Sequence, residues 1–126
     1  MIAIAEVAIA AYVRYLAPAD DADWLTARIN ALLHHGWLER TDPATFRVII
    51  GDWINELRAF PQWAIANAAA SLLRTPGRIG LAQMAQACRD EVGDARLELA
   101  ALRRLVDPEE QRAAWQRLEE RRNGRR

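Results

Sequence analysis

Apolar residues recur at every third or fourth position through most of the chain, which predicts a series of amphipathic α-helices. The pattern is clearest at 41–74, where Pro61 separates two apolar faces. Because proline fits the first turn of a helix but not its interior, we expect one helix to end at about Phe60 and the next to begin at Pro61. Asp42 is the expected N-cap of the first helix. The two faces comprise Phe46, Ile49, Ile50, Trp53, Ile54 and Leu57 before the proline, and Trp63, Ile65, Ala68, Ala69, Leu72 and Leu73 after it.

This proline-cornered helix pair is expected to organise the fold, because two apolar faces with almost no linker must pack on each other or on a third element. A competing interpretation makes the region before Leu57 a β-hairpin wing, as in winged-helix repressors. A wing strand would alternate apolar and polar residues, whereas 48–50 is continuously apolar and its spacing continues helically to Leu57. The pattern therefore favours the helix.

The N-terminal part of the chain predicts two more helices. Residues 2–16 are apolar nearly all round, which favours a central core helix and leaves an oligomer or partner surface as the alternative. Asp20, Asp21 and Asp23 supply negative charge at the start of a second helix, and Gly36 is the expected residue after its end.

The C-terminal part begins with a glycine- and proline-marked loop at 75–80, followed by an apolar face from Leu81 to Val92. Gly93 is expected to weaken or end that helix, and Asp94 to cap another one that reaches Val106. The sequence Asp-Pro-Glu-Glu at 107–110 is a strong helix start. We therefore predict an all-α fold of six or seven short helices, with a helical core domain at 1–106 and a charged C-terminal helix with a basic tail at 107–126.

The composition limits the classes of protein to which the chain can belong. The 126 residues are 52% apolar, which indicates a globular chain, and 17 basic residues balance 17 acidic ones. The single cysteine, Cys88, excludes an internal disulfide. The apolar N-terminus lacks a basic start and is interrupted by Glu6 and Arg14, so it predicts neither a signal peptide nor a membrane span. A cytoplasmic location is expected.

Catalytic and metal-binding patterns are weak. His34 and His35 are adjacent and point about 100° apart on a helix, so they do not suit a shared metal. Asp52 and Glu56 are expected on a solvated helix face, and Cys88 on an apolar one. We expect no enzyme activity, no cofactor and no metal.

Six residues are the candidates for contact with a partner. Aromatic side chains that are hard to bury and lie near arginines are typical of interfaces, and arginines can bind phosphate. The candidates are Trp37, Arg74, Arg78, Trp115, Arg121 and Arg122.

Three segments carry a resemblance to a known class of proteins. They are Leu-Leu-His-His at 32–35, Gly-Asp-Trp-Ile-x-x-Leu at 51–57, and Phe-Pro-x-Trp-Ala-Ile-x-x-Ala at 60–68. They resemble small helical bacteriophage and prophage proteins, including phage replication accessory proteins that load or inhibit the replicative helicase. The match extends over roughly residues 28 to 92. The loop at 74–79 is shorter and less basic than the arginine–proline run of that class. The resemblance implies stoichiometric binding to an ATPase, with no active site in this chain.

Three functional hypotheses follow. The first is a replication accessory protein that binds a replicative helicase or another nucleic-acid machine. The second is a phage-encoded inhibitor of a host defence complex, similar to an anti-CRISPR protein. The third is a small DNA-binding protein that uses Arg74, Arg78 and the C-terminal arginines. Self-association into a homodimer through the N-terminal helix is a further expectation.

Overall fold

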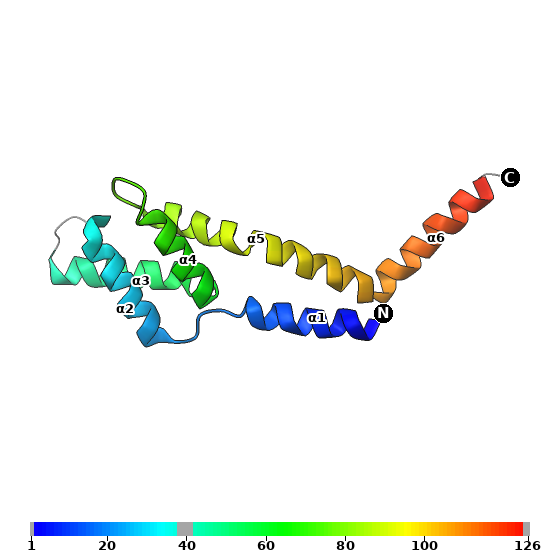
Figure 1. Ribbon diagram of the computed structural model, residues 1–126, viewed down its shortest axis with the longest axis horizontal. Coiled ribbons are helices and arrows are strands. Elements are labelled where there is room, and N and C mark those ends of the chain that lie inside the picture. Colours follow the sequence, from blue (N-terminus) through cyan, green and yellow to red (C-terminus); the bar gives the residue numbers. More distant parts are fainter. Residues whose placement is uncertain (1, 38–41, 125–126) are drawn as a thin grey trace. The chain divides into compact units, whose positions relative to one another are not determined.

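The computed structural model describes residues 2–37 and 42–124, and within them every regular element is helical (Figure 1). This confirms the all-α prediction. The elements are α1 (Ile2–Tyr15), α2 (Ala22–Leu32), the short helical turn η1 (Leu33–Trp37), α3 (Pro43–Leu57), α4 (Gln62–Leu72), α5 (Leu81–Val106) and α6 (Pro108–Gly124).

The chain divides into two units. The core unit is Leu16–Asp94, and the terminal unit combines Met1–Tyr15 with Ala95–Arg126. The boundary between them falls inside α5. Whether 107–126 forms a domain of its own stays a prediction.

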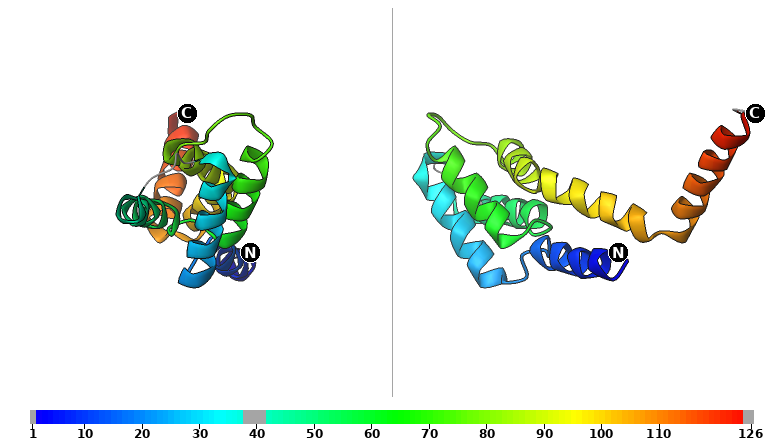
Figure 2. Two further views of the ribbon diagram at one scale, coloured as in Figure 1. Left: turned by 90° about the vertical axis from the view of Figure 1, so that its left-hand side faces the viewer. Right: turned by 45° about the vertical axis from the view of Figure 1, so that its right-hand side comes forward.

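The core unit is a bundle of α2, α3, α4 and the first part of α5, which lie together in both views of Figure 2. Its interior is a continuous cluster of apolar side chains from all four helices. Trp53 and Leu57 come from α3, Ile65 from α4, and Met84 and Cys88 from α5. Of the two predicted apolar faces, the buried residues are Trp53, Leu57, Ile65, Ala68 and Ala69. Leu73 was also expected on the second face, but it is 39% exposed, because α4 ends at Leu72.

Pro61 shapes the corner between α3 and α4 as an N-cap rather than as a helical residue, with φ −62° and ψ 150°. The amides of Ala64 and Ile65 both donate to its carbonyl at 3.1 Å. Helix α3 ends at Leu57, three residues earlier than expected, and the Phe60 amide closes the turn by donating to the Leu57 carbonyl. The residue before a proline avoids helical geometry, so Phe60 lies in the turn and not in α3.

Helix α3 excludes the β-hairpin wing over 43–57, because this stretch is helical throughout. Asp42 is its N-cap, as expected. One carboxylate oxygen accepts from the Thr45 amide at 2.9 Å and the other from the Thr45 hydroxyl at 2.8 Å. These two bonds, the amide bond first, hold the pKa of Asp42 below its ordinary value.

Helix α2 also follows its sequence signals. The Asp21 carboxylate accepts from the Trp24 amide at 3.0 Å and caps the helix. The helical path continues into η1, where Gly36 has φ 90°, a left-handed conformation that glycine adopts without strain.

The expected break at Gly93 is wrong, because α5 runs unbroken for 26 residues through Gly93 and Asp94. Gly93 is half-buried, and its neighbour Val92 is fully buried in the core. Burial of such side chains outweighs the helix penalty of one glycine, which is about 1 kcal/mol.

We expect Gly93→Ala to raise the free energy of unfolding by about 1 kcal/mol, because alanine favours helix and restricts the unfolded chain. A Cβ at this position meets nothing within 4 Å. Thermal denaturation followed by circular dichroism measures the change. Gly77→Ala is the matched control and should destabilise, since Gly77 has φ 97° in equally open space. A loss of stability in Gly93→Ala would contradict the prediction.

The expectation that the N-terminal helix lies in the centre of the core is also wrong. Helix α1 is not a central core helix, because Ala5 is its one buried residue among those whose side chains are described. Ile4 and Val7 are 75% and 71% exposed. In the described part of this unit only Ala5 and Leu99 are buried apolar residues.

Candidate protein-interaction surface

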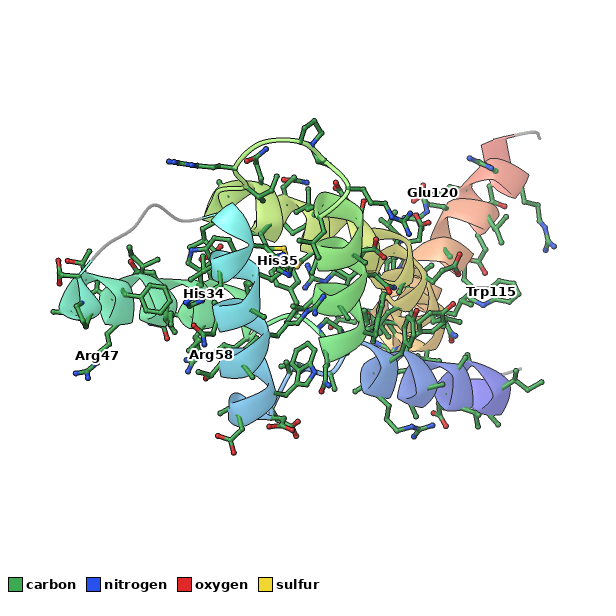
Figure 3. All side chains as sticks on the ribbon, turned by 60° about the vertical axis from the view of Figure 1, so that its left-hand side comes forward. His34, His35, Arg47, Arg58, Trp115 and Glu120 are labelled. Carbon is green, nitrogen blue, oxygen red and sulfur yellow. The ribbon has the colours of Figure 1, made fainter. Side chains whose placement is uncertain are left out.

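The two histidines lie in η1 as exposed residues, and the contacts of His34 stabilise the fold. The His34 Nδ1 donates to the Asn30 carbonyl at 2.7 Å. Its ring also meets Phe46 of α3 edge-on, with 5.5 Å between ring centroids (Figure 3). His34 thus satisfies a carbonyl at a helix end and connects α2 to α3. Within the described residues no group of three His, Cys, Asp or Glu side chains could hold a metal ion.

The other candidates for chemistry occupy the expected places. Asp52 and Glu56 are exposed on α3. Cys88 is fully buried in the core cluster, as its apolar face predicts. Burial, with the Glu91 carboxylate as a second cause, raises the pKa of the Cys88 thiol to about 12. A thiol held neutral in this way is a poor nucleophile.

We expect Cys88 to resist a thiol reagent at about pH 8 in the folded chain and to react only as the chain unfolds. The folded state holds the thiol proton more tightly than the unfolded state, whose pKa is near 9.0. The resulting contribution to stability is complete below pH 9.0 and is lost as the pH rises towards about 12. Chemical denaturation at several pH values should show this fall, and Cys88→Ala should show less of it. Rapid stoichiometric labelling of the folded chain would contradict the prediction.

Arg74 and Arg78 flank the loop between α4 and α5, and both are exposed. The Arg74 amide donates to the Ser71 carbonyl at 3.3 Å, and Gly77 turns the loop with φ 97°. The loop is anchored by Ile79, which is 2% exposed. Both arginine side chains therefore lie on the surface of the core unit.

Helix α6 carries the other predicted contact residues. It has no buried residue, and Trp115 is 68% exposed (Figure 3). Leu118 and Arg122 follow Trp115 at three and seven positions, so a helix places all three on one face. Arg121 is exposed on another face of the same helix. We call Trp115, Leu118 and Arg122 the α6 face.

Trp37 ends η1, and its side chain lies outside the described part of the structure. The remaining candidates fall into both units. Arg74 and Arg78 belong to the core unit, whereas Trp115, Arg121 and Arg122 belong to the terminal unit.

The sequence-based interpretation found only part of the exposed apolar surface: it named Trp115, and it kept an oligomer or partner surface as the alternative for the N-terminal helix. Ten large apolar side chains are exposed in the described residues, and eight of them belong to the terminal unit: Ile4, Val7, Val13, Tyr15, Leu97, Leu105, Trp115 and Leu118. Leu97 lies about 160° around α5 from the buried Leu99, and Leu105 about 120°, so both lie away from the buried face and are exposed. Apolar residues on more than one face of a helix were the available signal.

No protein-family model, curated protein or solved structure matches the chain. Among the described helices, none combines the length and apolar character needed to cross a membrane.

Proposed function

We propose that the chain is a non-enzymatic protein-binding module whose terminal unit contacts the partner. The observation that carries the proposal is that eight of the ten exposed large apolar side chains among the described residues belong to that unit. Large apolar patches on soluble proteins mark interaction sites, because their exposure to water costs free energy that a partner removes.

The composition of the α6 face supports the same proposal. Tryptophan and arginine are the residues that most often dominate binding energy at protein interfaces. Trp115 and Arg122 lie on one face of α6, with Leu118 between them. A helix face of this kind suits a groove on another protein, which an amphipathic helix enters with side chains at three- and four-residue spacing.

The partner proposed first is a replicative helicase, which makes the chain a phage-type replication accessory protein. The support is the resemblance carried by residues 28 to 92. The core unit, which contains that region, would then supply the scaffold, and the terminal unit the apolar contact.

Titration of the full chain into a purified hexameric replicative helicase tests this proposal. We expect stoichiometric binding with a negative heat-capacity change, because apolar surface is buried, together with a changed ATPase rate. Absence of binding to the helicase would overturn the proposed partner. Binding to a purified host defence nuclease complex instead would make the chain an inhibitor of that complex.

A parallel titration with duplex DNA separates the third hypothesis from the first two. A DNA-binding protein that neutralises several phosphates loses affinity steeply as salt rises. Tight, salt-sensitive binding to DNA, lost when Arg74 and Arg78 are replaced by alanine, would overturn the protein-binding proposal. We expect weak binding, because the formal net charge of the chain is zero.

A further inference from the structure

One face of helix α1 is exposed to solvent in the structure. Ala5 is buried, and Ala8, Ile9 and Tyr12 are half-buried. Ala10 is about 140° around the helix from Ala5 and is exposed. On either side of Ala10 lie Val7, 71% exposed, and Val13, 45% exposed. Apolar side chains of this size on the face opposite the covered one indicate an absent neighbour.

The same face carries the two charged residues of α1, Glu6 and Arg14. Both are exposed. Glu6 precedes Ala10 by four residues and Arg14 follows it by four, so each lies about 6 Å along the helix axis from Ala10. Val7 and Val13 lie three residues before and after Ala10. Opposite charges thus stand at mirrored positions about one central alanine, and so do the two valines.

We propose that two copies of the chain pair through this face of α1, antiparallel, with the two-fold axis at Ala10. A two-fold interface requires a surface that is complementary to itself, so that if one residue contacts a second, the second contacts the first. In this register each Glu6 lies level with Arg14 of the second copy, and each Val7 lies level with Val13. The pairing therefore forms two ion pairs close to the axis, and the valines lie at the edges of the same interface.

Other arrangements of two α1 helices lose this complementarity. In a parallel pair in register, Glu6 faces Glu6 and Arg14 faces Arg14, which is repulsive at both positions. An antiparallel pair centred one turn away leaves both charges without an opposite charge at the same level. The small side chain of Ala10 at the axis lets the two helices approach closely.

The inference does not rest on the proposed function, because it concerns α1 and a second copy rather than the α6 face and a helicase. The two can fail separately. If the chain dimerises but does not bind the helicase, the inference stands and the proposed function fails. If the chain binds the helicase as a monomer, the proposed function stands and the inference fails.

Charge exchange tests the register. The mass of the full chain is measured by sedimentation equilibrium over a range of concentrations for the wild type, E6R, R14E and the double variant E6R/R14E. Each single variant creates two like-charge contacts and should raise the dimer dissociation constant about tenfold, within the usual range for exposed ion pairs. The double variant restores opposite charges at both positions and should return to within about threefold of the wild type.

Circular dichroism of each variant shows that the fold is kept, because all the exchanged side chains are exposed. A wild type that stays monomeric at every concentration would overturn the inference. So would a double variant as weak as the single ones, since two copies of the chain would then not be paired in this register.

Cross-linking gives the orientation. Under oxidising conditions Ala10→Cys should form a disulfide-linked dimer, because position 10 meets itself at the two-fold axis. Ala3→Cys should not, because position 3 of one copy lies far from position 3 of the other in an antiparallel pair. Equal cross-linking of both variants would indicate a parallel pair and would overturn the inference. The native Cys88 is buried, so it does not compete in the folded chain.

Discussion

Leu57→Ala should lower the free energy of unfolding by about 3 kcal/mol, the usual loss when a buried leucine is truncated and its cavity collapses only in part. Leu57 is fully buried at the end of α3, among side chains of the core cluster from neighbouring helices. Its removal takes contacts from several helices of the core unit at once. Denaturant unfolding followed by tryptophan fluorescence measures the loss, because Trp53 lies in the same cluster.

Val48→Ala is the matched control for this substitution. Val48 is on the same helix and is 64% exposed, so its truncation should change stability by less than about 0.5 kcal/mol. Equal losses in the two variants would show that α3 does not bury the face described here.

Trp115→Ala should weaken partner binding at least about thirtyfold, which corresponds to about 2 kcal/mol or more, the threshold for a dominant interface residue. The reason is that Trp115 offers the largest exposed apolar side chain of α6 together with a ring N–H that a partner can accept from. Titration calorimetry with the purified partner measures the effect. The stability of the free chain should stay the same, because α6 has no buried residue.

Two controls make the Trp115 result specific. Leu118→Ala, on the α6 face, should weaken binding by a smaller factor. Val48→Ala, an exposed apolar residue of the core unit, should leave the dissociation constant unchanged. If Trp115→Ala binds as tightly as the wild type, the partner uses another surface.

The core unit was predictable from sequence because its helices each carry one apolar face. Trp53, Leu57 and Ile65 recur at helical spacing, and all three are buried. Asp42 and Gly36 were predictable for a different reason, since a capping side chain and a left-handed glycine are local features that need no knowledge of neighbours.

The errors arise where packing rather than local preference decides. Gly93 was expected to break a helix, but the burial of Val92 beside it holds α5 together. Helix α1 was expected in a core because it is apolar, yet apolar character alone does not say which neighbour covers a face. For the same reason the exposure of Ile4, Val7 and Leu97 could not be predicted from periodicity.

The candidate contact residues were only partly predictable. The sequence marked Trp115 because few apolar residues surround it in α6, and that isolation is what leaves it exposed. It did not mark Leu97 or Leu105, because periodicity does not show which side of α5 a neighbouring element covers.

Helix α6 holds its shape with intrahelical bonds and the cap at Asp107, without any side chain anchored in a core. Its backbone amides should therefore exchange with deuterated solvent faster than those of α4, where four residues are buried. Binding of a partner should slow the amide exchange of α6 towards the rate of α4. Protection that develops along α6 on mixing would then trace the contact residue by residue and show that ordering of the helix contributes to the entropy of binding.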